Sequence, residues 1–368
     1  MTLNSVSLFK LYFLSLIFAT SHILGIWSLL LPISLGYIFL YKYRSYLKDN
    51  KILKNFIVLV VVSSLLSSIW KGTYVDILHS FKTIILLFSN VGVVLLLMSF
   101  SKRKLFYFTV FTNIIVIGLL LISKVLGYSV LEAVHLLFFG SSYHIVTWLL
   151  LLLNSLVLLE YSYKYKLNKT NLLMLSILFL MSSLLLQGRT GIAISAIIFI
   201  YILVRYYKIS IIPLLLLSLI FSTFNVNVDQ VAQKFGGDAY ERGVKLGPRE
   251  LIWGCYYDNI EMNNLLYGFN PDKVAGPCIE SIGFNTRTES SFLSLISEVG
   301  ASSILVLLLI FYSIIKNIHI YTMTIPILLA IIVRISTGDF LFFTVFDWII
   351  LYLAFGLQVS KKAKRSFS

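Results

Sequence analysis

The most informative feature of this sequence is its low content of charged residues. Only 12% of its 368 residues are Asp, Glu, Lys or Arg, whereas about 25% is usual in a soluble domain. Apolar residues make up 58% of the chain, and its mean hydropathy is +0.91. They form long runs broken by short basic clusters, which is typical of a helical protein that crosses a membrane many times. The short alternating segments of a β-barrel are not present.

Several chemical motifs are also missing. The sequence has no P-loop, no GxGxxG or HExxH motif, no Cys/His set with zinc spacing, and no closely paired aspartates to hold Mg²⁺. We therefore expect no cofactor and a mechanism without metal. The net charge of +14 could suit nucleic acid. However, the lysines lie in short clusters between apolar runs, as orientation signals do, so we expect no nucleic-acid partner.

The apolar runs predict an all-α polytopic membrane protein with about 12 transmembrane helices. Residues 1–224 would form nine of these spans, 225–289 one large loop with short helices, and 290–368 the last spans and a basic tail. The predicted spans are 8–22, 25–41, 55–70, 83–100, 105–123, 145–163, 171–187, 190–207, 209–224, 290–315, 320–336 and 341–359.

Basic clusters follow every second predicted span. Because cytoplasmic loops collect Lys and Arg, this period places both termini in the cytoplasm and the loop 225–289 on the opposite side of the membrane. The clusters lie at 42–54, 102–104, 164–169, 205–208, 316 and 361–365.

The large outer loop contains the two cysteines of the chain, Cys255 and Cys278. In an oxidising compartment they could form a disulfide, and the alternative is two free thiols. Within the loop, the apolar spacing of 247–262 predicts an amphipathic helix with Pro248 in its first turn. We expect this helix to lie on the membrane surface with its aromatic side chains toward lipid.

Five of the nine arginines fall on or just inside the predicted outer face, where positive charge is usually scarce. The planar fork of a guanidinium binds phosphate better than the point charge of a lysine does. We therefore interpret these arginines as ligands of the diphosphate in a lipid-linked sugar donor. They are Arg189, Arg242, Arg249, Arg287 and Arg334.

Two of these arginines lie in tight outer turns. Arg189 stands between Gly188 and Gly191, which permit a sharp turn or the close approach of a substrate. It could line the mouth of a cavity, or it could reach toward lipid headgroups. Arg334 could join the same phosphate site or form an ion pair with Asp339.

Arg242 and Arg249 lie in the large loop, seven residues apart. On a helix they would share one face, so that both could reach one diphosphate. The alternative is that they form loop ion pairs with Glu241 and Glu250, their neighbours in sequence.

Two glutamates mark the chain's return to the membrane. Glu289 could be the general base that deprotonates an acceptor hydroxyl, or a negative charge that stabilises a helix N-terminus. Glu298 lies about two turns deeper in an apolar run, where an ionisable group is expected to be functional or paired. Its expected partners are Arg189 and Arg334.

Taken in order, these features resemble Wzy-type O-antigen polymerases of the O-antigen polymerase/ligase superfamily. The resemblance rests on the spans, the large outer loop and three short motifs within 187–300. The motifs are Gly188-Arg189-Thr190-Gly191, Trp253 followed by Leu266-Tyr267-Gly268-Phe269-Asn270, and Glu289-Ser290-Ser291-Phe292-Leu293 followed by Glu298-Val299-Gly300.

The resemblance implies a GT-C-like, metal-independent glycosyltransferase of a bacterial inner membrane, acting at the periplasmic face. The donor would be an undecaprenyl-diphosphate-linked oligosaccharide, and the acceptor the nonreducing end of another lipid-linked repeat unit. Arg189 carries over best as a catalytic, diphosphate-binding residue, followed by Arg249, and Glu289 stands where a base would. The expected partners are this lipid-linked glycan, membrane lipid and a chain-length regulator protein.

Other functions stay open at this point. O-antigen ligases typically place a histidine where the loop returns to the membrane, and this sequence has Glu289 there. A flippase or other transporter of lipid-linked oligosaccharide would also suit twelve spans, but the sequence shows no two-half symmetry. A sensor or assembly scaffold would have no need of five outer arginines.

Overall fold

The computed structural model describes residues 4–19, 25–72, 74–138, 143–163, 167–187, 189–208, 248–281, 291–316, 318, 321–336 and 344–357. Within these ranges the regular structure is helical, and the β-structure is limited to one isolated bridge between Tyr163 and Tyr321. Among the described residues, four segments are long and apolar enough to cross a membrane: Lys51–Lys71, Asp76–Met98, Lys102–Val125 and Lys169–Leu186. The chain is thus an all-helical membrane protein, as its composition predicts.

The first half of the chain forms long helices joined by short turns. Shorter apolar helices pack among the four long ones, and we describe these as parts of one bundle. In order they are α1 (Ser5–Ala19), η1 (Gly25–Leu29), α2 (Leu30–Lys42), α3 (Arg44–Asp49), α4 (Lys51–Lys71), α5 (Tyr74–Met98), η2 (Lys102–Leu105), α6 (Phe106–Val125), α7 (Val130–Leu137), α8 (Tyr143–Tyr161), α9 (Lys169–Leu186) and α10 (Arg189–Tyr207).

The second half begins with four short helices and then returns to the bundle. The short helices are α14 (Pro248–Asn259), α15 (Met262–Tyr267), α16 (Pro271–Val274) and α17 (Gly276–Ser281). The bundle helices are α18 (Ser291–Val299), α19 (Ser302–Ile315), α20 (Thr324–Ser336) and α21 (Trp348–Leu351), which continues into the π-helical turn η4 (Tyr352–Gly356).

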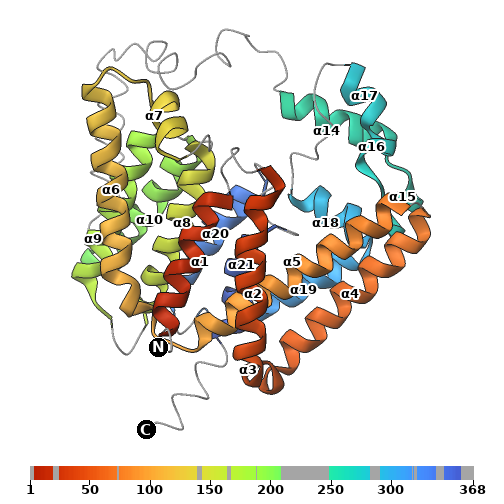
Figure 1. The fold of residues 1–368 in the computed structure, drawn as a ribbon, viewed down its shortest axis with the longest axis horizontal. Coiled ribbons are helices and arrows are strands. Elements are labelled where there is room, and N and C mark those ends of the chain that lie inside the picture. The colour runs from red at the N-terminus through yellow and green to blue at the C-terminus, as the bar shows by residue number, and fades with distance from the viewer. Residues whose placement is uncertain are drawn as a thin grey trace.

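The bundle has two sides with a shared centre (Figure 1). Helices α6, α8, α9 and α10 form one side, α4, α5, α18 and α19 form the other, and α1, α20 and α21 lie between them. The short helices α14–α17 and the helix α7 lie at one end of the bundle, and α3 lies at the opposite end. Segments predicted to be outside and inside are therefore separated along the bundle.

One predicted span is broken. The run 290–315 was expected to be continuous, but α18 ends at Val299 and α19 begins at Ser302. Gly300 between them has φ +57°, a left-handed conformation that side chains rarely adopt. The freed backbone is used, because the N–H of Ala301 donates to the carbonyl of Leu266 at 3.0 Å. The break therefore joins the bundle to the segment that contains α15.

A second boundary also differs from its prediction. The predicted span begins at residue 83, but α5 already begins at Tyr74. Asp76 and His79 are thus part of this helix, and they hydrogen-bond to Asn270 and Glu298. This extension brings ionisable groups into contact with α18.

The described part of the predicted last span, residues 344–357 of 341–359, lies in the protein interior. Its described helix begins at Trp348, and every residue from Val345 to Leu357 is buried. Its backbone is bonded on several sides: Tyr12 donates to the Val345 carbonyl at 3.0 Å, and Asn50 donates to the Phe355 carbonyl at 3.2 Å. This segment fills the centre of the bundle.

A buried amide pair holds the other side together. Asn113 of α6 and Asn154 of α8 bond to each other at 3.3 and 3.4 Å, and the Ser182 hydroxyl of α9 donates to Asn113 at 3.1 Å. All three side chains are fully buried. Such bonds fix the relative positions of helices where lipid tails supply no hydrophobic driving force.

Candidate functional site

A polar site lies where the ends of α4, α5 and α18 meet the short helices. Helices α4 and α5 form a hairpin around Gly72, and α15 packs against both α4 and α18. The N–H of Phe269 donates to the carbonyl of Ser297 at 3.1 Å. The short helices are therefore bonded directly to the residue before Glu298.

The central group of this site is the buried carboxylate of Glu298. Its Oε1 accepts a hydrogen bond from Nδ1 of His79, and its Oε2 accepts a second hydrogen bond from the Thr83 hydroxyl at 3.3 Å. The Glu298 side chain is 7% exposed, whereas the His79 side chain is 56% exposed. One buried carboxylate thus orients a histidine that is open to its surroundings.

A second carboxylate and a lysine adjoin this pair. Asp76 is buried one turn before His79 on α5, and it accepts a hydrogen bond from Asn270 at 3.2 Å. Lys71 at the end of α4 interacts electrostatically with both Glu298 and Asp76. These opposite charges reduce the cost of placing two carboxylates in an apolar bundle.

Small residues allow the elements to approach closely here. Gly268 has φ +86°, and a side chain on it would lie 2.4 Å from the Ser67 hydroxyl oxygen and 2.5 Å from the Ser297 carbonyl oxygen. The buried hydroxyls of Ser64 and Ser67 have no hydrogen-bond partner among the described residues. The face of α4 that meets the site therefore carries buried polar groups.

Two aromatic rings lie at the edge of the site. Trp70 and Tyr267 stack with centroids 4.0 Å apart, and they are 55% and 44% exposed. They immediately precede Lys71 and Gly268 in sequence. Amphipathic rings of this kind are common at the boundary between membrane and water.

The short helices are held by a disulfide bond. Cys255 of α14 and Cys278 of α17 are bonded, which confirms one of the two alternatives left by the sequence. Ile252, Tyr256 and Ile279 form a small apolar core beside the bond, and Leu293 and Ile296 of α18 pack against it. We call residues 248–281 the disulfide-linked cap.

The cap corrects part of the prediction for 247–262. The helix begins at Pro248 as expected, but Tyr256 packs inward against Phe269 and is 1% exposed. Trp253 and Tyr257 remain on the exposed face, at 37% and 87%. One aromatic side chain therefore stabilises the cap itself, and the other two are free to meet a membrane surface.

The predicted site residues are only partly within the described structure. Arg189 is the first residue of α10, Arg249 lies in α14 and Arg334 lies in α20, but their side chains are outside the described part. Arg242, Arg287 and Glu289 lie outside it altogether. The convergence of these guanidinium groups on one diphosphate stays a prediction.

The partner of Glu298 was not foreseen. The sequence suggested Arg189 or Arg334, whereas the described partners are His79 and Thr83, more than 200 positions away. A signal was available, since Lys71, Asp76 and His79 interrupt the apolar pattern between two predicted spans on the outer side. Among the described residues, no cluster of three His, Cys, Asp or Glu side chains could hold a metal ion.

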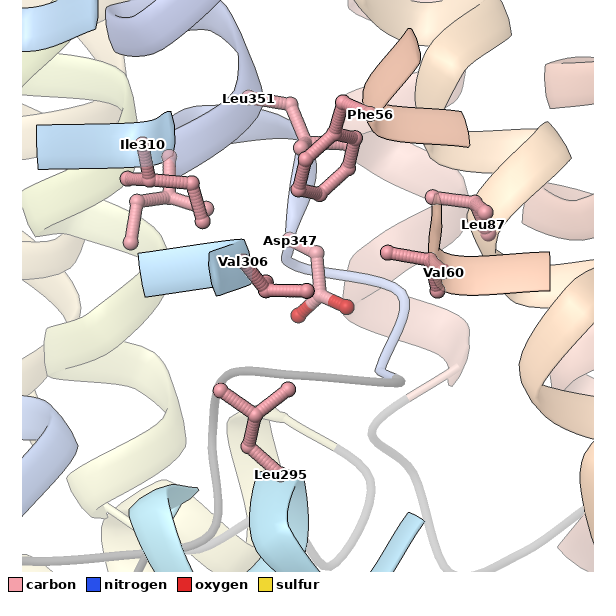
Figure 2. A pocket seen from close by; sticks show the side chains of 9 residues that line it. Phe56, Val60, Leu87, Leu295, Val306, Ile310, Asp347 and Leu351 are labelled. Atoms are coloured by element: carbon pink, nitrogen blue, oxygen red, sulfur yellow. The ribbon is translucent and has the colours of Figure 1, made fainter. Parts of the chain in front are cut away.

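A small cavity of about 20 Å³ lies deeper in the bundle, enough for one water molecule. Figure 2 shows the Asp347 carboxylate between Val60 of α4 and Val306 of α19. This carboxylate accepts bonds from the N–H and hydroxyl of Thr344 at 3.1 and 3.0 Å. These bonds stabilise the turn before α21, so we assign Asp347 a structural role and do not place the functional site in this cavity.

Comparisons with protein-family profiles, with curated proteins and with solved structures found no match to this chain. The sequence pattern and the geometry of the polar site are therefore the features of this chain that point to a function.

Proposed function

We propose that the chain is an O-antigen repeat-unit polymerase. It would transfer an undecaprenyl-diphosphate-linked glycan to the nonreducing end of another lipid-linked repeat unit, at the periplasmic face of a bacterial inner membrane. The observation that carries this proposal is the Glu298–His79 pair beneath the disulfide-linked cap. Ionisable groups at membrane depth are costly, so they usually mark a path or site for substrate.

The reaction suits an enzyme that uses cationic side chains at a membrane surface. Negative charge grows on the diphosphate as the glycosidic bond breaks. Guanidinium groups fixed beforehand in a partly dry site stabilise that charge, and such electrostatic effects are often the largest in catalysis. The five arginines predicted at the outer face are the candidates for this task.

Arg189 is the strongest of these candidates. It belongs to the motif Gly188-Arg189-Thr190-Gly191, which resembles a motif of O-antigen polymerases, and it is the first residue of α10. The first turn of a helix leaves backbone N–H groups without helical partners, and these favour phosphate. A guanidinium beside such groups would hold a diphosphate from two directions.

The break at Gly300 favours one second candidate, a flippase for the same lipid-linked glycan. Transporters often build their substrate sites from discontinuous helices, and α18 ends beside Glu298. A flippase would move the lipid between leaflets without lengthening its glycan. The two functions therefore differ in product and can be separated in one reconstituted system.

The test uses purified protein in vesicles that contain a synthetic undecaprenyl-diphosphate-linked repeat unit. The polymerase should produce a ladder of longer lipid-linked glycans and release undecaprenyl diphosphate. Arg189→Ala should lower the rate roughly 100-fold, since losing one preorganised donor to a developing charge costs about 3 kcal/mol.

Arg44→Ala is the matched control. Arg44 lies on the predicted inner side, exposed and stacked over Tyr41 at 5.0 Å. Its loss should leave the ladder unchanged. A wild-type protein that moves the lipid across the bilayer but forms no ladder would favour the flippase, and a ladder made equally well by Arg189→Ala would remove the arginine from the mechanism.

A further inference from the structure

We infer that His79 is the general base of this reaction and that Glu298 is its positioning residue, an inference that rests on the function proposed above. The pair joins a buried carboxylate to a half-exposed imidazole across two helices. A base oriented by a third group is the arrangement that recurs wherever a hydroxyl must be activated for attack.

Among the described ionisable groups of the site, only His79 is suited to receive a proton from a substrate. Both carboxylate oxygens of Glu298 are already bonded, one to His79 and one to Thr83. Asp76 is buried and bonded to Asn270. Lys71, as a cation, has no lone pair to accept a proton.

The hydrogen bond to Glu298 decides which ring nitrogen is available. A carboxylate only accepts, so Nδ1 of His79 carries the proton in their bond and Nε2 carries the lone pair. Among the described residues none hydrogen-bonds to Nε2, and the side chain is 56% exposed. Nε2 therefore carries a lone pair on a side chain that is half exposed, as a base requires.

Glu298 is held in place by the structure around it. Thr83 fixes its second oxygen, and the bond from Phe269 to the carbonyl of Ser297 fixes the backbone one residue earlier. The cap thereby sets the direction of the carboxylate and, through it, the ring of His79. This chain of contacts gives the cap a part in positioning the base.

The chemical step balances as follows. The acceptor hydroxyl oxygen forms a bond to the anomeric carbon of the donor glycan while its proton passes to Nε2 of His79. The bond from that carbon to the diphosphate oxygen breaks, and its electron pair leaves with undecaprenyl diphosphate. The imidazolium, stabilised by Glu298, then releases the proton to solvent.

This assignment gives the base role to His79 in place of Glu289. The test measures the initial rate of ladder formation by the reconstituted full chain. His79→Ala should be about 10²- to 10⁴-fold slower, the usual contribution of a general base. Its KM for the donor should stay close to that of the wild type, because the lost contact serves the acceptor proton.

Added imidazole separates a missing base from a damaged structure. Because His79 is half exposed, free imidazole should reach the space left by His79→Ala. It should raise the rate of this variant at least tenfold over its rate without imidazole. His135→Ala is the matched control: His135 is an exposed histidine in the last turn of α7, also on the predicted outer side. It should keep the wild-type rate and gain nothing from imidazole.

Glu298→Gln tests the positioning role. The glutamine keeps an oxygen that can accept from Nδ1 but removes the charge that stabilises the imidazolium. We expect kcat to fall roughly a hundredfold with little change in KM. A rise in KM with unchanged kcat would instead mean that Glu298 contacts the donor, which would overturn this role.

The outcomes distinguish the inference from the function on which it rests. If the wild type forms a ladder and His79→Ala forms it equally fast, the base role is wrong and the polymerase stands. If His79→Ala is inactive and imidazole restores nothing, His79 is structural and the inference is again overturned. If the wild type forms no ladder at all, the proposed function itself fails.

Discussion

The disulfide of the cap allows a quantitative prediction. The bond between Cys255 and Cys278 spans a separation of 23 residues. In the chain-entropy description, closing a loop of that length stabilises the folded form by about 3.4 kcal/mol relative to the open chain. Removing the bond should therefore raise the local opening of the cap about 300-fold.

The double substitution Cys255→Ala and Cys278→Ala removes the bond without placing a hydroxyl in a buried position. The apolar contacts among Ile252, Tyr256 and Ile279 remain, so we expect the cap still to form but to open more often. Hydrogen exchange followed by mass spectrometry in detergent or nanodiscs measures this opening in α14 and α17.

The amides of α6 provide an internal control. This helix packs on the other side of the bundle, away from the cap, so its protection should not change. Full protection of the cap amides in the double variant would refute the reasoning. It would mean that the apolar contacts alone keep the cap closed and that the disulfide adds no stability to it. Lost protection in α6 as well would mean global loosening, which also contradicts a local role.

Two further predictions concern the backbone and pH. Gly300→Ala should lower thermal stability in detergent by at least about 1–2 kcal/mol, the cost of a left-handed conformation for a residue with Cβ, and an unchanged melting temperature would contradict it. The pKa of Glu132 lies below its ordinary value because the Ser129 hydroxyl and then the Ser129 N–H donate to its carboxylate. A carboxyl group whose pKa is lowered on folding stabilises the folded form at pH values above its ordinary pKa, and this stabilisation is lost as pH falls through the lowered pKa. Hydrogen exchange in α7 should therefore rise over that fall in pH. Glu132→Gln should show no such rise.

Much of the bundle could be predicted from apolar runs alone. The lengths of α4, α6 and α9 follow from uninterrupted hydrophobic stretches between basic clusters, because backbone groups in lipid must bond within their own segment. The break at Gly300 could not be placed in this way, since apolar residues continue on both sides of it. Its cause is a bond to a distant segment, from Ala301 to Leu266.

The site was harder to predict for the same reason. Glu298 stood out in the sequence as an ionisable group in an apolar run, but its partner was not evident. His79 is 219 positions away and lies between two predicted spans. The packing of α18 and α5 against the same helix, α4, brings the two together, and hydropathy carries no information on which helices pack.

The position of residues 344–357 has a consequence for biogenesis. During synthesis the helices α1, α4 and α5 leave the ribosome long before the segment that later fills the space among them. Until then Asn50 and Tyr12 lack the carbonyl groups that they bond in the finished protein. We therefore expect the early helices to pack loosely in the bilayer until this late segment inserts among them and completes the core.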